Sequence, residues 1–247
     1  MTLRLLSYNI RYGGKGREAA LLSVIRACAP DIVVFQEATR PEVIERLARG
    51  ASMLQWASQR RQSLGFMSRR RVAHYAWHRP RFSRHAFLEI APAGASVTII
   101  GVHLSAVHAA WTEHRRSVEL RSLLAALASR EPAFHAVVGD FNTLAPGEIL
   151  DVRKLPHRLR TLVWLSGGRI RLRAIQAILD AGYADAFRYR HLNDPGFTFP
   201  TRDPHIRLDY LFVPDTHVRR VVSCDVVTGA DVTTASDHLP LVADIDA

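Results

Sequence analysis

Several apolar runs of strand length in this sequence end abruptly at polar residues with chemically active side chains. The run at 31–35 ends at Gln36-Glu37, and the run at 134–138 leads into Gly-Asp-Phe-Asn at 139–142. Continuous apolar runs are typical of strands buried on both faces, which helices or a second sheet must cover. The chain is therefore predicted to be an α/β protein whose polar strand ends gather at one edge.

Strands and helices are predicted along the rest of the chain. Apolar residues at helical spacing predict helices at 18–28, 41–49 and 113–130, with Thr39 and Thr112 as candidate N-caps. Strands are predicted at 3–9, 31–35, 96–104, 134–138, 208–213, 218–227 and 240–245. The pattern fits either two packed sheets with helices outside or one open α/β sheet. Because no Pro/Gly/Ser-rich linker divides the sequence, we expect a single domain over residues 1–247.

The chain is strongly basic. Its formal net charge is +10, and arginine carries nearly all of the positive charge, since Lys15 and Lys154 are the only lysines. Such an excess favours an anionic partner, which is nucleic acid, anionic lipid or a phosphorylated small molecule. A genome-wide preference for arginine is the competing explanation. Arginine binds phosphate through two parallel hydrogen bonds, so the composition suits a phosphate substrate without choosing among them.

The cysteines and the hydropathy pattern favour a soluble protein. Cys28 and Cys224 lie in apolar runs without metal-ligand spacing, so we expect both to be buried thiols rather than a disulfide. No signal peptide is recognised, and no apolar stretch approaches the length of a membrane span. A monomeric, cytoplasmic protein is expected.

Polar residues at the strand ends are the candidate site. Taken singly, each has an ordinary explanation, because Asp and Asn begin turns and His often satisfies a buried hydrogen bond. Their coincidence at so many strand ends favours a shared site at one rim of the sheets. These residues are Asn9, Glu37, His103, Asp140, Asn142, Asp209, Asp237 and His238.

The motifs around these residues resemble the endonuclease/exonuclease/phosphatase superfamily, the deoxyribonuclease I-like metal-dependent phosphoesterases. The resemblance runs from residue 7 to residue 238 and is most specific in its last three motifs. It implies a four-layer α/β sandwich, in which two packed mixed β-sheets are flanked by helices. The motifs are Ser7-Tyr8-Asn9, Gln36-Glu37, Gly65-Phe66-Met67-Ser68-Arg69, Val102-His103-Leu104, Gly139-Asp140-Phe141-Asn142, Arg207-Leu208-Asp209-Tyr210 and Ser236-Asp237-His238.

The resemblance also implies a metal site. Glu37, helped by Asn9, is expected to hold Mg²⁺, with Mn²⁺ as the alternative cation, and Asp237 is expected to be a second ligand or to help position the metal. Oxygen ligands, with water and phosphate completing the shell, suit a hard cation of this kind. A bound cation neutralises charge on the phosphoryl group in the transition state.

The implied catalytic roles fall on the second half of the chain. His238, oriented by Asp209, is expected to activate water or to stabilise the phosphorane charge. Asp140 is expected to orient or deprotonate the attacking water, and Asn142 to fix its geometry or contact phosphate. His103 is expected to donate a hydrogen bond to a phosphate oxygen. Whether Asp140 or His238 is the base is left open.

Two departures from the family pattern bear on the substrate. The abasic-site endonucleases have tyrosine where this chain has His103, and a second acidic residue where it has Arg11. Both differences argue against an abasic-site enzyme. The histidine resembles the deoxyribonuclease I, deadenylase and phospholipase branches instead.

Further substrate contacts are expected from Arg69 and from the basic segment 155–173, which contains Trp164 and Arg169. Three interpretations of this segment compete. It is a rim for a nucleic-acid backbone with Trp164 stacked on a base, a lipid-interface segment, or a loop leading into a helix at 169–181. The segment Gly196–Thr201 resembles an aromatic-Thr-aromatic-Pro element that shapes the site wall, and a plain structural turn explains it equally well.

The sequence therefore predicts a metal-dependent phosphoesterase, foremost an endo- or exonuclease that cleaves DNA or RNA as a phosphodiesterase. The alternative is a phosphatase or phospholipase C-like hydrolase of a small or lipid phosphate. A non-catalytic nucleic-acid or membrane binder is the third hypothesis. It is disfavoured because Glu37, Asp140, Asn142, Asp209 and His238 are all present, and binding alone does not need the complete set.

Overall fold

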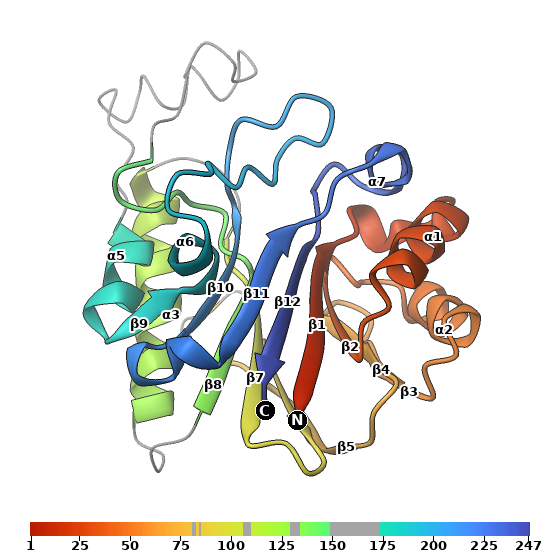
Figure 1. Cartoon of the computed structure of the whole chain (residues 1–247), viewed down its shortest axis with the longest axis horizontal. Coiled ribbons are helices and arrows are strands. Elements are labelled where there is room, and N and C mark those ends of the chain that lie inside the picture. The colour runs from red at the N-terminus through yellow and green to blue at the C-terminus, as the bar shows by residue number, and fades with distance from the viewer. Residues whose placement is uncertain (81–82, 84, 106–109, 129–133, 149–172) are drawn as a thin grey trace.

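The computed structural model describes the chain except for residues 81–82, 84, 106–109, 129–133 and 149–172. Its described part contains two six-stranded sheets packed against each other, with helices on both outer sides (Figure 1). Each sheet is mixed, because it contains one parallel pair, β1 with β2 or β7 with β8, among antiparallel ones. The predicted four-layer α/β sandwich is thus confirmed, and the open single sheet is excluded.

The first sheet has the strand order β11-β12-β1-β2-β4-β3. The parallel pair β1 and β2 places Asn9 opposite Gln36, and the antiparallel pair β1 and β12 places Ser7 opposite Leu241. The ends of β1 and β2 and the start of β12 therefore share one edge. The strands are β1 (Thr2–Asn9), β2 (Ile32–Gln36), β3 (Gln55–Ala57), β4 (Gly65–Ser68), β11 (Val221–Val226) and β12 (Leu241–Asp246).

The second sheet has the order β5-β6-β7-β8-β10-β9. The parallel pair β7 and β8 places His103 beside Asp140, and antiparallel β10 places Asp209 on the other side of Asp140. The ends of β7 and β8 and the start of β10 thus share an edge as well. The strands are β5 (Val72–His78), β6 (Phe87–Pro92), β7 (Val97–His103), β8 (Phe134–Asp140), β9 (Tyr183–Asp185) and β10 (Asp209–Pro214).

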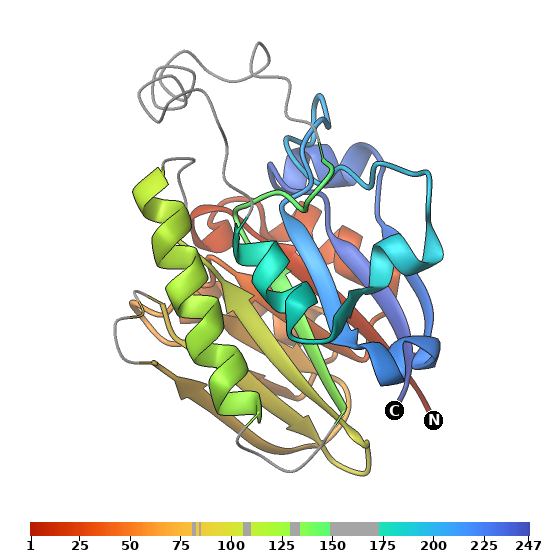
Figure 2. The same cartoon turned by 90° about the vertical axis from the view of Figure 1, so that its left-hand side faces the viewer.

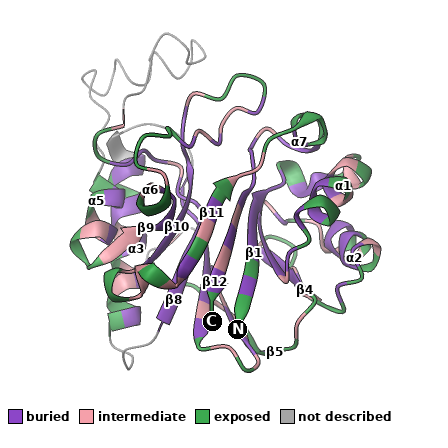
Figure 3. Cartoon of the chain, viewed as in Figure 1, coloured by how far each residue is buried: buried purple, intermediate pink, exposed green. Residues whose placement is uncertain are grey.

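Both faces of the central strands are buried, which explains their continuous apolar runs (Figure 3). Leu5 and Val34 point between the sheets, whereas Leu6 and Val33 point toward the helices. α1 (Glu18–Cys28), α2 (Pro41–Gly50) and α7 (Ala230–Ala235) lie on the outer side of the first sheet. α3 (Ala110–Ala128) and α5 (Arg173–Asp180) cover the second (Figure 2), and the short α6 (Ala186–Arg190) packs against β10 and β11.

Some predicted boundaries were wrong. α3 begins at Ala110, so Thr112 lies inside the helix instead of capping it. Arg40 is the N-cap of α2, because Thr39 takes part in a turn in which its N–H donates to the Glu37 carbonyl. The strand predicted at 218–227 begins instead at Val221, because residues Asp215–Arg220 form the 3-10 helix η3.

Other predictions hold within the described residues. Cys28 and Cys224 are buried free thiols. The helix predicted at 169–181 corresponds to α5, with residues 169–172 outside the described part. None of the described helices is long and apolar enough to cross a membrane.

Candidate active site

The side chains predicted at strand ends meet at one end of the sandwich. In the first sheet Asn9 ends β1, and Glu37 follows the end of the neighbouring β2. In the second sheet His103, Asp140 and Asp209 are neighbours across the ladder. A 3.0 Å hydrogen bond from Asn9 Nδ2 to Asp140 Oδ2 joins the two sheets at this point. The structure therefore brings these five predicted residues together.

His238 and Asp209 form a buried pair. The ring donates from Nδ1 to Asp209 Oδ2 at 2.9 Å, which leaves Nε2 facing Asp140. The backbone N–H of Asp209 donates to Thr198 Oγ1, and the Phe199 ring lies 4.9 Å from the His238 ring. The segment 196–201 thus forms the wall beside His238. This geometry supports the prediction that Asp209 orients the His238 ring. The catalytic role of His238 stays a prediction.

Asp140 lies at the centre of the site. Its Oδ1 accepts the Asn142 backbone N–H at 2.8 Å, while Oδ2 accepts Asn9 Nδ2. The same Oδ2 lies 3.8 Å from His103 Nε2 and 3.9 Å from His238 Nε2. These separations exceed a hydrogen bond. An atom placed between the carboxylate and the two imidazoles would be within reach of all three.

Burial and charge set the protonation of this group. Burial raises the pKa of Asp140 to about 7, against the opposing charge of His238. Burial by itself lowers the pKa of His238, but the charge and hydrogen bond of Asp209 outweigh it and raise that pKa to about 9. At neutral pH the pair Asp209–His238 is therefore an ion pair, and Asp140 is the group poised to gain or lose a proton.

The stability of the metal-free protein is expected to fall as the pH rises above neutrality. The pKa of His238 is raised from 6.5, so its stabilisation is fully present below about 6.5 and is lost as the pH rises through about 9. The shift corresponds to about 3 kcal/mol. Thermal unfolding of the protein and of His238→Gln, both in EDTA, measures this. A melting-temperature difference that does not change with pH would contradict it.

Ser63 is a member of the site that the sequence did not reveal. Its Oγ contacts His103 Nδ1, and the His103 ring stacks on His85 with centroids 5.3 Å apart. When Ser63 donates to Nδ1, the proton of a neutral ring lies on Nε2, facing Asp140. The only sequence signal was the position of Ser63 just before the motif Gly65-Phe66-Met67-Ser68-Arg69, and that position does not identify a ring partner.

Oxygen ligands gather where β1 and β2 end. Asn9 Oδ1 accepts the Arg11 N–H at 3.0 Å, and Glu37 Oε2 accepts the Tyr12 N–H at 2.6 Å. Because the two donors are consecutive backbone groups, both side chains are held against the same turn after β1. Glu37 also has a φ of 57°, a sparsely populated conformation that turns its side chain at the strand end. This pair of hard oxygen donors fits a cation such as Mg²⁺.

The predicted metal ligand Asp237 has a different partner. Its Oδ2 lies 3.2 Å from Arg11 Nε, in a partly exposed ion pair. Among the described residues, the group with metal-ligand proximity is Asp140, Asp209 and His238, whose ligand atoms all lie within 4.8 Å of one another. The geometry thus offers two candidate sets of metal ligands, one of Asn9 and Glu37 and one of Asp140, Asp209 and His238. The Asp237 carboxylate is instead paired with the Arg11 guanidinium.

One predicted substrate contact, Arg69, is not brought into the site. Arg69 follows β4 and donates its N–H to the carbonyl of Asp31, just before β2 begins. Glu37 lies beyond the other end of β2, roughly 15 Å along the strand. Arg69 therefore lies at the wrong end of the sheet for a substrate contact, because the antiparallel turn returns β4 away from the site. Trp164 and Arg169 lie outside the described residues.

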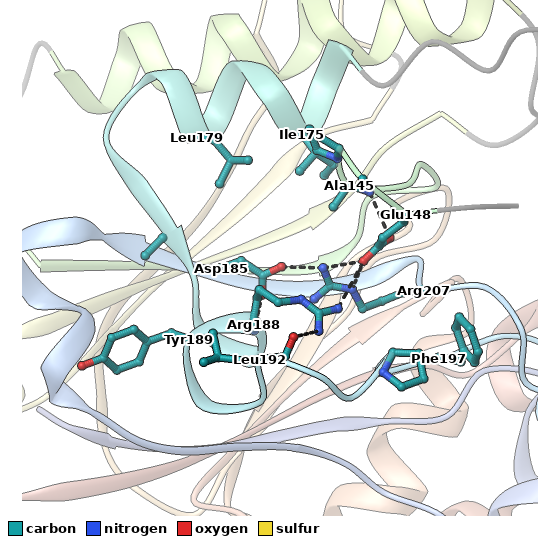
Figure 4. Close-up of a pocket in the computed structure, with 14 residues that line it drawn as sticks. Ala145, Glu148, Ile175, Leu179, Asp185, Arg188, Tyr189, Leu192, Phe197 and Arg207 are labelled. Atoms are coloured by element: carbon teal, nitrogen blue, oxygen red, sulfur yellow. Dashed lines mark hydrogen bonds and ion pairs between the residues drawn. The ribbon is translucent and has the colours of Figure 1, made fainter.

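A buried arginine supports the start of β10 (Figure 4). The Arg207 guanidinium is 2% exposed and pairs with Asp185 Oδ2 at 2.6 Å and with Glu148 Oε1 at 2.7 Å. It also lies over the Tyr210 ring, 4.4 Å from its centroid. Because Arg207 is two residues before Asp209, these contacts fix the backbone that carries Asp209.

Comparisons with known proteins agree with this geometry. Residues 6–238 match the family described as Endonuclease/Exonuclease/phosphatase family. No curated protein matches the sequence.

Three solved structures share the fold. The 3′ phosphatase NExo from Neisseria, bound to product DNA hairpin, is 16% identical, with 99% and 100% of the two chains covered and a TM-score of 0.71. An AP endonuclease from Archaeoglobus fulgidus is 19% identical, with the same coverage and a TM-score of 0.72. An endonuclease/exonuclease/phosphatase from Beutenbergia cavernae is 21% identical, covers 99% of this chain and 71% of its own, and has a TM-score of 0.69.

The family match spans nearly the whole chain, and its two ends fall on the motifs at the end of β1 and the start of β12. The protein is a member of the endonuclease/exonuclease/phosphatase family.

Proposed function

We propose that this protein is a divalent-metal-dependent phosphodiesterase that cleaves DNA or RNA. The observation that carries the proposal is the position of Asp140 Oδ2, 3.8 Å and 3.9 Å from the Nε2 atoms of His103 and His238. A carboxylate flanked by two imidazoles is suited to place a water beside a phosphate whose oxygens accept from the rings.

In this proposal the protonation states of Asp140 and His238 give them different roles. Asp140, with a pKa of about 7, takes the proton from the attacking water. His238 is held as a cation by Asp209 and donates from Nε2 to a phosphoryl oxygen, where negative charge develops. His103 donates a second hydrogen bond to the phosphate. Asn142 keeps Asp140 in place through its backbone N–H. Asp140 is thus the base in this proposal, and His238 the electrostatic partner.

Magnesium, with manganese as an alternative, is the cation proposed for the site. Glu37 and Asn9 would hold it through their side-chain oxygens at the ends of β1 and β2. A cation bound there supplies positive charge that polarises the phosphoryl group.

Nucleic acid is the favoured substrate because charge and exposure at the rim suit a polyanion. The chain carries a net charge of +10. At the edge of the site the Arg11 side chain is 47% exposed, and its guanidinium lies 5.1 Å from the exposed Tyr12 ring. Cation and aromatic ring are the groups that contact a phosphate backbone and its bases. The DNA-bound Neisseria structure supports the same substrate class.

A substrate panel tests the proposal. Purified protein is incubated with single- and double-stranded DNA and RNA, with a 3′-phosphorylated oligonucleotide, and with lipid and small phosphate esters, each with Mg²⁺ or EDTA. We expect Mg²⁺-dependent cleavage of polynucleotides. Release of phosphate or a phosphorylated headgroup with polynucleotides intact would favour the phosphatase or phospholipase C-like alternative. No hydrolysis of any ester would contradict both.

A further inference from the structure

Three charged residues are buried on one face of α3. Glu113, Arg116 and Glu119 are 3%, 2% and 1% exposed. Their spacing of three residues places them on one side of α3, the helix that covers the second sheet (Figure 2). Arg116 Nε and Nη2 lie 3.0 Å and 2.9 Å from Glu113 Oε2, so Glu113 and Arg116 form an ion pair with two contacts. We call these three residues the α3 cluster.

The α3 cluster holds the loop that follows His103. The Glu119 carboxylate accepts hydrogen bonds from Ser105, at 3.3 Å from its N–H and 3.1 Å from its hydroxyl. Arg116 Nη1 donates to the Ser105 carbonyl at 2.7 Å. Both backbone polar groups of Ser105 and its side chain are thus fixed, two residues after His103.

The α3 cluster also holds the loop that follows Asp140. Thr143 Oγ1 donates to Glu113 Oε2 at 3.1 Å, and the N–H of Ala174, in α5, donates to Glu113 Oε1 at 2.8 Å. Thr143 follows Asn142, which has a φ of 52°. Such a conformation persists only where surrounding contacts impose it. Asn142 Nδ2 in turn donates to the Leu104 carbonyl at 3.0 Å and so ties the two loops together.

Stability alone does not explain these charges. Burying an ion costs several kcal/mol even after relaxation, and apolar side chains of similar volume often replace buried ion groups without loss of stability. The same helix face continues with Leu120, Leu123 and Leu127, which pack on the sheet. What apolar side chains cannot supply is directed hydrogen bonding to Ser105 and Thr143.

We propose that the α3 cluster is a positioning device that fixes the loops of His103 and Asn142 in the geometry needed for phosphate hydrolysis. The inference rests on the proposed function and deepens it. The hydrogen bonds of Glu113, Arg116 and Glu119 within the described residues reach Ser105 and Thr143, and we infer that the α3 cluster acts through these two residues. Misplacement of a reacting group by about 1 Å costs a factor of about 10² in rate, so loose loops lower kcat even in a folded enzyme.

The test replaces the α3 cluster by apolar residues in Glu113→Leu/Arg116→Met/Glu119→Leu. We expect the melting temperature to stay the same or to rise, kcat to fall by about 10- to 100-fold, and KM to change little. The matched control is Arg4→Met/Asp244→Leu, which removes a two-bond ion pair between β1 and β12, at positions away from their site ends. The control is expected to keep kcat.

Two further measurements keep the test decisive. If the triple variant does not fold, Glu113→Gln is used, which keeps the side-chain shape but loses the charge that pairs with Arg116. Its melting temperature is expected to fall, because the buried Arg116 charge loses its partner, and its kcat, measured well below that temperature, is expected to fall as well. Backbone hydrogen exchange of Ser105 and Asn142 is measured as well, and we expect it to be faster in the variant. A variant with normal kcat and normal exchange would overturn the proposal.

The exchange measurement also separates the two claims. If the wild-type protein hydrolysed none of the phosphate esters, the proposed function would fail, and exchange at Ser105 and Asn142 would still decide whether the α3 cluster orders the loops. Equal exchange in the wild type and the folded variant would then overturn the α3 cluster's role by itself.

Discussion

Replacing His238 by alanine is expected to lower kcat by about 10²- to 10⁴-fold, with little change in KM. Its Nε2 is the donor that faces Asp140 across 3.9 Å, and Asp209 holds the ring as a cation. Both the donor and its charge act mainly where charge develops during reaction, so the loss falls on kcat. Steady-state kinetics on the best substrate of the panel measures the effect.

A second His–Asp pair in the chain provides the control for this prediction. His191 Nε2 lies 2.9 Å from Asp225 Oδ1, on the edge strand β11. His191→Ala removes the same side chain from a His–Asp contact of the same length outside the site, and its kcat is expected to stay near the wild-type value. Asp209→Asn is expected to lower kcat as His238→Ala does, because it removes the negative charge that keeps the His238 ring protonated. A His238→Ala enzyme with wild-type kcat would refute the assigned role.

Removing divalent cations is expected to abolish activity, and added Mg²⁺ or Mn²⁺ to restore it. Without a bound metal, the phosphoryl charge next to Glu37 and Asp140 is offset by the His238 cation but not by Arg11, because the partly exposed Arg11 guanidinium is engaged by Asp237. Glu37→Gln is expected to raise the Mg²⁺ concentration for half-maximal activity by at least about tenfold. Activity is titrated against Mg²⁺ after dialysis with EDTA, and Mg²⁺ binding is measured separately by calorimetry.

Matched variants locate the cation. Glu42→Gln, an exposed carboxylate in the first turn of α2, is the control and is expected to leave the Mg²⁺ titration unchanged. Asp237→Asn is expected to have a smaller effect than Glu37→Gln, because the Asp237 carboxylate already pairs with Arg11. Full activity of the EDTA-treated protein would rule out metal dependence. A larger effect at Asp237 than at Glu37 would return Asp237 to the ligand set.

Much of the fold was predictable because buried strands have a strong local signature. The runs that became β2 and β8 are apolar throughout, since both of their faces are covered. The residues just beyond these strands, such as Glu37 and Asn142, are polar, and burial in the core does not explain a polar side chain. The change from an apolar run to a polar residue therefore marked the candidate site. The predicted N-caps Thr39 and Thr112 were wrong, because α2 is capped by Arg40 and α3 begins at Ala110. The capping preference of threonine by itself does not decide where a helix begins.

Contacts between distant segments could not be predicted in this way. Ser63 reaches His103 across forty positions, and Arg11 pairs with Asp237 from the opposite end of the chain. The residues around Ser63 or Arg11 in the sequence do not indicate which distant side chain each will contact. Those contacts depend on how the strands pair and pack. No local pattern marked Glu113 and Glu119 as buried charges, whereas the packing of α3 on the second sheet buries both.

The sequence by itself determined the strands β1, β2, β7, β8, β10, β11 and β12, their polar ends and the order of the site motifs, because apolar runs and turn chemistry are local properties. Only the tertiary structure decided which strand ends share an edge. Parallel pairing of β7 with β8 and antiparallel pairing with β10 put His103, Asp140 and Asp209 side by side, and the antiparallel β4 put Arg69 at the far end. Register between strands distant in sequence depends on the whole packed core, so it becomes fixed only when both sheets have formed.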